Sequence, residues 1–200
     1  MTVVEPTRDR GWRTVPNLIS LIRLLCVPVF VYLLLGADRP LAAGVLLAVL
    51  GATDWVDGWI ARRYDQGSSI GKVLDPVADR ILLIAAAVVL LIDGTVPWPV
   101  GVLVLAREAV ISVAVVALAA AGARRIDVQW VGKAGTLALM FALPGFLLVS
   151  ITSGAVRTVL LVVTWTFTVG GLLLSYWAAV GYIPLARTAL REGRAVGEAA

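Results

Sequence analysis

The sequence predicts an all-α integral membrane protein, with six transmembrane helices and a short amphipathic N-terminal segment. Two observations lead to this fold class. Apolar residues make up 60% of the 200 residues and charged residues only 15%, whereas soluble globular domains have about 45–50% apolar and about 25% charged residues. In addition, six apolar stretches are each long enough to cross a bilayer, which takes about 20 helical residues. The composition therefore excludes a water-soluble globule and a disordered chain.

The six expected spans follow one another closely along the chain. They cover residues 17–36, 41–63, 76–92, 98–122, 131–152 and 157–183. The connectors between them contain turn-forming or charged residues, for example Asp93-Gly94 and Ser153-Gly154. We expect an N-terminal cytoplasmic or interfacial segment at residues 1–15, a six-span domain at 16–184 and a cytoplasmic tail at 185–200.

Lys and Arg indicate how the spans are oriented, because cytoplasmic loops carry an excess of these residues. They precede the first span, surround the second and fourth connectors and recur in the tail, whereas the opposite side has only Arg39 and Arg157. We therefore expect a multi-pass protein of the cell (inner or plasma) membrane, with both termini in the cytoplasm. The net charge of +4 fits this topology. No basic helix indicates nucleic-acid binding, so we expect no nucleic-acid partner.

The residues that the chain lacks narrow its chemistry. It has no histidine and one cysteine, Cys26, which lies inside an apolar stretch. An intrachain disulfide is therefore impossible, and we interpret Cys26 as a small buried apolar residue. Without histidine the chain has no Ser-His or Cys-His nucleophile pair. Its chemistry must depend on carboxylates and cations.

Four carboxylates lie where an ordinary membrane helix would have none. Asp54 and Asp57 are three residues apart near the cytoplasmic end of the second span, and Asp75 and Asp79 are four apart at the start of the third. Each pair therefore shares one face of its helix. Because a short connector makes these spans antiparallel neighbours, we expect all four acids to meet at one level, just inside the cytoplasmic leaflet.

Carboxylates gathered in this way repel one another unless protons or cations relieve the repulsion. Hard oxygen ligands without Cys or His favour Mg²⁺ or Mn²⁺ over zinc or iron. We therefore expect two divalent cations that could clamp a phosphate or diphosphate during in-line displacement. The alternative is structural ion pairing of these acids with nearby arginines: Arg62, Arg63, Arg80 or Arg107.

The acidic segment resembles the signature of a known family. Asp54, Asp57, Gly58, Ala61 and Arg62 are followed by Gly71, Asp75 and Asp79 with the spacing D-x2-D-G-x2-A-R-x8-G-x3-D-x3-D. This pattern is similar to that of the CDP-alcohol phosphatidyltransferases. The stretches TVPNLISLIRLLCVP, GKVLDPVADRILL, AREAVIS and VGKAGT extend the resemblance over most of residues 14–145. They resemble the branch that contains phosphatidylglycerophosphate synthases and CDP-type cardiolipin synthases.

The resemblance implies an enzyme of phospholipid synthesis that transfers the phosphatidyl group of CDP-diacylglycerol to an alcohol and releases CMP. It implies a six-helix, commonly dimeric membrane protein whose active site is open to the cytoplasm and to lipid. It also implies two divalent cations held by Asp54, Asp57, Asp75 and Asp79, with Asp79 as the catalytic base. The residues implied to bind CDP are Asp54, Gly58, Ala61, Arg62 and Gly71.

The acceptor alcohol is less closely defined. Arg107 and Lys133 could bind an acceptor phosphate, but Arg107 could instead pair with Glu108 or an aspartate of the cluster, and Lys133 could extend to the membrane interface. Arg23, in the first span, also has a binding and a structural interpretation. Our first expectation is glycerol 3-phosphate, which gives phosphatidylglycerophosphate. Phosphatidylglycerol, which gives cardiolipin with release of CMP, is a nearly equal alternative.

Two departures from the resembled pattern bear on this choice. Phosphatidylglycerophosphate synthases tend to carry another Arg where this chain has Val115, and they favour GKxKT where this chain reads Gly132-Lys133-Ala134-Gly135-Thr136. Two cations that could hold a phosphorylated acceptor are thus missing, which favours phosphatidylglycerol. An inositol phosphate acceptor is a weaker alternative. A membrane transporter is another, although it would be expected to show inverted halves or broken helices near the midplane.

Overall fold

The computed structural model describes the chain except for residues 1–14, 65–70, 121–129 and 198–200. Side chains are described over residues 17–53, 77–114 and 130–181. Apart from Val15, the amphipathic segment expected at residues 1–15 therefore lies outside the described residues. The same holds for most of the connectors that follow the second and fourth expected spans.

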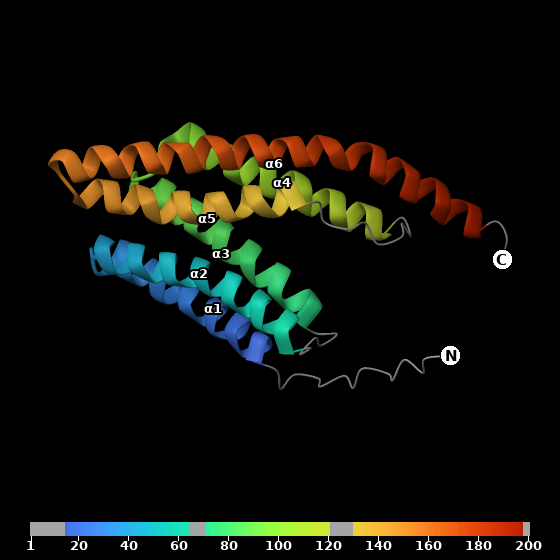
Figure 1. Ribbon diagram of the computed structural model, residues 1–200, viewed down its shortest axis with the longest axis horizontal. Helices are drawn as coiled ribbons and strands as arrows, with labels where there is room; N and C mark the ends of the chain where they lie inside the picture. Colours follow the sequence, from blue (N-terminus) through green and yellow to red (C-terminus); the bar gives the residue numbers. More distant parts are fainter. Residues whose placement is uncertain (1–14, 65–70, 121–129, 198–200) are drawn as a thin grey trace. The chain divides into compact units, whose positions relative to one another are not determined.

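The described part of the chain folds entirely into helices (Figure 1). Six of them are α-helices, and a π-helical turn, η1, directly extends the first. Their bounds in chain order are α1 Val15–Val31, η1 Tyr32–Gly36, α2 Pro40–Tyr64, α3 Gly71–Asp93, α4 Trp98–Ala120, α5 Trp130–Ile151 and α6 Gly154–Gly197. These helices coincide with the six stretches expected from the sequence, so the predicted all-α fold class is confirmed.

Several of these helices have the length and composition of membrane spans. Among the described residues, three stretches are long and apolar enough to cross a bilayer: Asn17–Gly36, Trp130–Ile151 and Gly154–Gly181. A shorter apolar helical stretch covers Pro40–Thr53. Large apolar side chains are exposed along these helices, as expected where lipid rather than water is the solvent. The protein is thus a multi-pass membrane protein.

The helix ends follow the turn residues of the sequence, with one exception. Gly94 and Gly154 have positive φ angles of 80° and 62°, which glycine adopts without steric cost; Gly94 follows the end of α3 and Gly154 begins α6. The exception is the C-terminal end of α6. Its backbone remains helical to Gly197, beyond residue 183, where the last span was expected to end.

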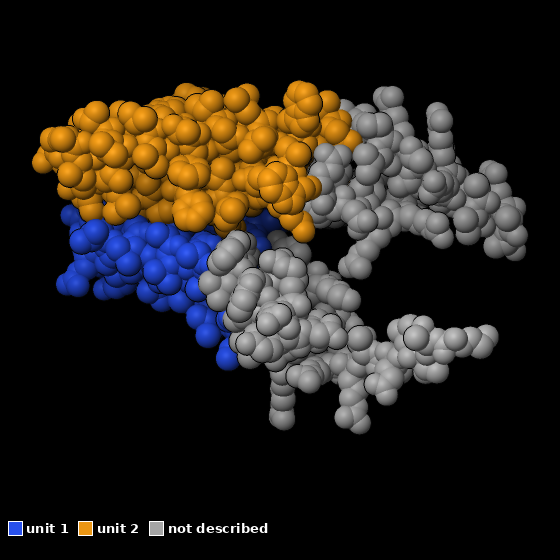
Figure 2. Space-filling view, viewed as in Figure 1, with its two compact units in different colours: residues 1–85 blue, residues 86–200 orange. Residues whose placement is uncertain are grey.

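The chain divides into two compact units, residues 1–85 and 86–200 (Figure 2). In the first unit, α1 and η1 pack against α2, and their apolar core includes Phe30, Leu34, Ala43 and Leu47. This packing joins α1, which carries Arg23, to α2, which carries Asp54 and Asp57. The expected extent of the six-span domain, residues 16–184, stays a prediction.

In the second unit, α5 and α6 lie side by side along their lengths, and α4 contacts α6 (Figure 1). Glycines allow a close approach of α5 and α6. A Cβ atom on Gly135 would lie 2.5 Å from Ser175 Oγ and 2.9 Å from the Ser175 backbone nitrogen, and one on Gly171 would lie 3.1 Å from the Gly135 carbonyl oxygen. Small residues therefore allow the two backbones to approach, as is common between membrane helices.

Candidate active site

The four aspartates predicted to form the metal site lie on two consecutive helices. Asp54 and Asp57 belong to α2, and Asp75 and Asp79 belong to α3. Because the backbone is helical at all four positions, the three- and four-residue spacings place each pair on one helix face. The side chains of Asp54, Asp57 and Asp75 lie outside the described ones, so the convergence of the four carboxylates stays a prediction.

The residues predicted to bind CDP occupy the same two helices. Gly58, Ala61 and Arg62 follow Asp54 within the last turns of α2, and Gly71 is the first residue of α3. Their side chains also lie outside the described ones, and their role stays a prediction. Within the described side chains there is no group of three or more Asp, Glu, Cys or His residues that could hold a metal ion. Only Asp79, of the four predicted ligands, falls among those side chains.

Asp79 contacts an arginine from the first helix. Arg23 Nη1 donates a hydrogen bond to Asp79 Oδ1, and the two side chains form an ion pair. The Arg23 side chain is 0% exposed and that of Asp79 is 22% exposed. The structural interpretation of Arg23 is therefore the one observed: its guanidinium links α1 to the carboxylate predicted to be the catalytic base.

Arg23 is the last of three buried polar residues on α1. Asn17, Ser20 and Arg23 are all buried and follow one another at intervals of three residues, a spacing that places them along one side of the helix. Of these three residues, only Arg23 was identified as a candidate from the sequence. The regular spacing of polar residues within an apolar span is the signal that could have found them.

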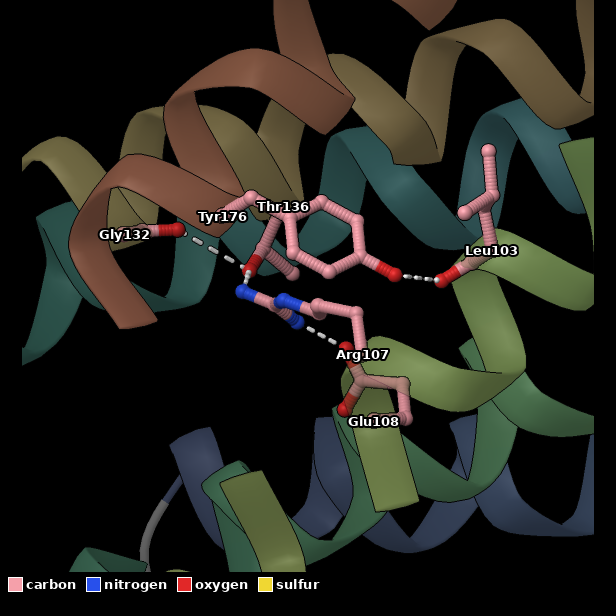
Figure 3. A network of polar contacts seen from close by, with 6 residues as sticks. All are labelled: Leu103, Arg107, Glu108, Gly132, Thr136 and Tyr176. Atoms are coloured by element: carbon pink, nitrogen blue, oxygen red, sulfur yellow. Dashed lines mark hydrogen bonds and ion pairs between the residues drawn. The ribbon is translucent and has the colours of Figure 1, made fainter. Parts of the chain in front are cut away.

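Arg107 lies in the second unit, in a polar network that joins three helices (Figure 3). Its Nη1 donates to Oε1 of Glu108, the next residue on α4, and the two side chains form a buried ion pair. Its Nη2 donates to Thr136 Oγ1 on α5 over 2.8 Å, and the Thr136 hydroxyl donates to the Gly132 carbonyl oxygen over 3.0 Å. The pairing with Glu108 that the sequence allowed is thus observed, and acceptor binding by Arg107 stays a prediction.

Two further residues belong to this part of the second unit. Tyr176, on α6, donates its hydroxyl hydrogen to the Leu103 carbonyl oxygen on α4 over 2.9 Å (Figure 3). Lys133 is exposed near the start of α5, next to Gly132. Neither Thr136 nor Tyr176 was identified as a functional candidate from the sequence. Thr136 stands in the quoted VGKAGT stretch, whereas no local pattern marks Tyr176, which lies 73 residues from Leu103.

The fold and the positions of the aspartates define the class of protein: a multi-pass helical membrane protein with carboxylates on two consecutive helices. The sequence profile of the CDP-alcohol phosphatidyltransferase family matches residues 13–170. The chain belongs to this family of enzymes. Membership implies CDP-diacylglycerol and an alcohol as substrates and confirms the family expected from the acidic signature.

Two relatives fall in the expected branch. A Streptomyces coelicolor protein named cardiolipin synthase (CMP-forming) is 38% identical over 195 residues, which cover 94% of this chain and 90% of that protein. An Escherichia coli K12 protein named CDP-diacylglycerol–glycerol-3-phosphate 3-phosphatidyltransferase is 38% identical over 135 residues, which cover 64% of this chain and 74% of that protein. The similarity to the first relative extends over more of this chain.

Proposed function

We propose that this enzyme transfers the phosphatidyl group of CDP-diacylglycerol to the terminal glycerol hydroxyl of phosphatidylglycerol, which forms cardiolipin and CMP. Glycerol 3-phosphate is the acceptor that the sequence alone places slightly ahead. The relatives favour the other alternative, because the match to the cardiolipin synthase covers 94% of the chain and that to the glycerol-3-phosphate enzyme 64%.

The observation that carries the proposal is the extent of the match to the cardiolipin synthase, and the buried ion pair between Arg107 and Glu108 is compatible with the same acceptor. Glycerol 3-phosphate ends in a phosphate monoester, which carries up to two negative charges, whereas the phosphodiester of phosphatidylglycerol carries one. Because Glu108 already balances the charge of Arg107, Lys133 is the predicted acceptor residue whose positive charge has no ion pair among the described side chains. One net charge matches a phosphodiester better than a monoester, since an excess charge in a region of low dielectric is costly.

The packing at Gly135 supports the same acceptor. This is the position at which the resembled phosphatidylglycerophosphate synthase pattern has a second lysine. Here a Cβ atom would lie 2.9 Å from a backbone nitrogen of α6 and 2.5 Å from Ser175 Oγ. A lysine at residue 135 would therefore force α5 and α6 apart, so this packing excludes a second acceptor cation at this position.

The chemistry of the donor set fits two divalent cations. The predicted ligands offer only hard carboxylate oxygens, which suit Mg²⁺ or Mn²⁺. They lie on one face of each of two helices: Asp54 and Asp57 on α2, Asp75 and Asp79 on α3. When bound, the cations would neutralise negative charge on the diphosphate and on the phosphoryl group in transfer. The remaining contacts to CDP-diacylglycerol would come from the protein: Asp54, Gly58, Ala61, Arg62 and Gly71 would bind the CDP moiety.

The transfer itself needs one base and no covalent nucleophile. Asp79 would accept the proton of the acceptor hydroxyl while the oxygen of that hydroxyl attacks the lipid-side phosphorus of CDP-diacylglycerol. The bond from this phosphorus to the bridging oxygen of the diphosphate breaks, and CMP leaves with the electron pair of that bond. Arg23, through its contact with Oδ1 of Asp79, would hold the carboxylate in one orientation. Arg107 and Lys133 would bind the phosphodiester of the acceptor.

We further propose that both termini and the active site face the cytoplasm, on the basis of the Lys and Arg distribution. A cysteine introduced as Ala200→Cys in a Cys26→Ser background should then react with a membrane-impermeant maleimide in inside-out vesicles. Reaction in sealed right-side-out vesicles alone would contradict this orientation.

A homodimer is the assembly that the family resemblance implies. Mass measurement of the detergent-purified protein should give twice the chain mass after subtraction of the detergent. A species of single-chain mass at working concentration would contradict this part of the proposal.

An acceptor panel tests the proposed reaction. Purified protein is given CDP-diacylglycerol and Mg²⁺ or Mn²⁺, with glycerol 3-phosphate, phosphatidylglycerol, inositol phosphate or serine, and the product is identified by mass. We expect cardiolipin from phosphatidylglycerol and little product from the other alcohols. Phosphatidylglycerophosphate as the main product would restore glycerol 3-phosphate as the acceptor, and no CMP release with any alcohol would contradict the proposed reaction.

A further inference from the structure

We infer that Tyr176 and Thr136 are positioning residues for Arg107, and that together they set the affinity of the enzyme for its phosphodiester acceptor. The inference rests on the proposed function, in which Arg107 binds the acceptor phosphate. The two hydroxyls act on different parts of Arg107: Tyr176 on the backbone of its helical turn and Thr136 on its guanidinium (Figure 3).

The contact of Tyr176 fixes the helical turn that ends at Arg107. Leu103 and Arg107 are four residues apart on α4, so the Leu103 carbonyl oxygen is the regular α-helical acceptor for the Arg107 backbone amide. Tyr176 donates to this same oxygen over 2.9 Å. A carbonyl oxygen has two lone pairs and can accept both hydrogens. The hydroxyl on α6 therefore attaches α6 to the backbone position from which the Arg107 side chain extends.

The contact of Thr136 fixes the guanidinium itself. A threonine hydroxyl has one hydrogen to donate, and Thr136 gives it to the Gly132 carbonyl oxygen over 3.0 Å. Its lone pairs are then available to Arg107 Nη2, which lies 2.8 Å away. Because Glu108 Oε1 accepts from Nη1, the two terminal nitrogens of the guanidinium have partners on α4 and α5. The orientation of the group is therefore defined by two helices.

The crossing of α5 and α6 brings these two hydroxyls to their places. Thr136 directly follows Gly135, and Tyr176 directly follows Ser175; Gly135 and Ser175 are the residues at which the helices approach most closely among the contacts described above. The tight crossing thus fixes the register of α5 and α6, and with it the register at which both helices bond to α4. An error in that register would displace both contacts to Arg107 together.

Loss of either hydroxyl should affect acceptor binding more than the chemical step. Neither residue is predicted to contact CDP or the reacting atoms, so the KM for CDP-diacylglycerol should not change. A hydrogen bond to a charged or backbone group that orients a ligand contributes enough to change affinity by about fivefold. We therefore expect Tyr176→Phe and Thr136→Val each to raise the KM for phosphatidylglycerol by about this factor, with kcat within about twofold of wild type.

The experiment measures both KM values and kcat for purified full-length variants in mixed micelles with Mg²⁺. Tyr32→Phe, which removes an exposed tyrosine hydroxyl from η1, is the matched control and should change neither KM. Thr136→Ser keeps a hydroxyl that can accept from Arg107 and should retain the wild-type KM. Thermal denaturation of each variant separates a defect of folding from a defect of binding.

The outcomes are distinguishable from those that test the proposed function. If wild type forms cardiolipin but Tyr176→Phe and Thr136→Val keep its KM, the inference is wrong while the proposed function stands. Equal increases of the KM for both substrates would also overturn it, because that result indicates a general structural defect. If wild type uses a different alcohol, the proposed acceptor is wrong, and the inference is judged by the same change in the KM for that alcohol.

Discussion

Arg23 on α1 and Asp79 on α3 form an ion pair in which the arginine side chain is fully buried and the aspartate is 22% exposed. The two residues are 56 positions apart, and both belong to the first compact unit. Burial of a charge costs free energy unless the charge is paired. The Asp79 carboxylate therefore stabilises the buried Arg23 guanidinium. Asp79 keeps some exposure, as the role of catalytic base proposed for it requires.

Replacement of Arg23 tests whether this ion pair supports catalysis. In Arg23→Met the methionine replaces the aliphatic part of the arginine side chain but lacks the guanidinium that donates to Asp79. The Asp79 carboxylate therefore loses its fixed orientation. We expect kcat to fall by at least about tenfold, with a smaller loss in Arg23→Lys, which keeps the charge without the planar group. Arg157→Met, at an exposed arginine of α6, is the control. Wild-type kcat in Arg23→Met would contradict a role in positioning.

Asp79→Asn tests the predicted base directly. The amide has nearly the shape of the carboxylate and can still accept from Arg23 through its oxygen, but it cannot take up the acceptor proton. We expect CMP release to fall to the background rate while the protein still folds, with a lower melting temperature because the buried Arg23 guanidinium loses its counter-charge. The measurement is CMP release by chromatography together with thermal denaturation in detergent. Substantial remaining turnover would exclude Asp79 as the base.

Removal of divalent cations should abolish turnover reversibly. Chelation with EDTA should stop CMP release, and excess Mg²⁺ or Mn²⁺ should restore it, because the predicted ligands are hard carboxylates. Asp54→Asn, Asp57→Asn and Asp75→Asn should each raise the Mg²⁺ concentration needed for half-maximal activity. Full activity in EDTA after extensive dialysis would contradict the metal-dependent account.

Glu108→Gln tests the charge argument for the acceptor. The amide can still accept from Arg107, but the pair then carries a net positive charge. A doubly charged phosphate monoester should benefit more than a phosphodiester, so we expect the ratio of kcat/KM for glycerol 3-phosphate to that for phosphatidylglycerol to rise by about tenfold. The measurement is competition between the two acceptors with product masses as readout. An unchanged or lower ratio would contradict the argument.

Gly135→Ala tests the helix crossing. A methyl group at this position meets Ser175 Oγ at 2.5 Å and a backbone nitrogen at 2.9 Å, and overpacking of this kind typically costs about 1–3 kcal/mol of stability. We expect a lower melting temperature in detergent. Gly170→Ala is the matched control on α6, because a Cβ atom there has no heavy atom within 4 Å. Equal melting temperatures for the two variants would show that the crossing is not tight.

The sequence predicted the helices well because their signals are local. Most ends of the apolar stretches lie next to glycine, proline, aspartate or serine, and residues such as Gly94 and Gly154 lie at the observed helix ends. The π-helical turn at Tyr32–Gly36 was not predicted, since its composition does not differ from that of the α-helix before it. The polar tail also carried no signal that α6 would continue to Gly197.

The candidate site was predicted in its residue types but only in part in its contacts. The spacing of Asp75 and Asp79 determines that they share a helix face, whereas the partner of Asp79 comes from another helix and could not be read from spacing. Arg107 and Glu108 are neighbours in sequence, and adjacent residues on a helix do not normally face each other; only the length of their side chains permits the ion pair. The contact of Tyr176 with Leu103 depends entirely on how α4 and α6 pack.

The most direct test of the central claim follows the phosphatidyl group itself. Proteoliposomes with the purified enzyme receive CDP-diacylglycerol with deuterated acyl chains, unlabelled phosphatidylglycerol, glycerol 3-phosphate and Mg²⁺. We predict cardiolipin with one deuterated and one unlabelled diacyl half, formed in equal amount to the released CMP. Deuterated phosphatidylglycerophosphate as the main product, or cardiolipin without deuterium, would contradict the account.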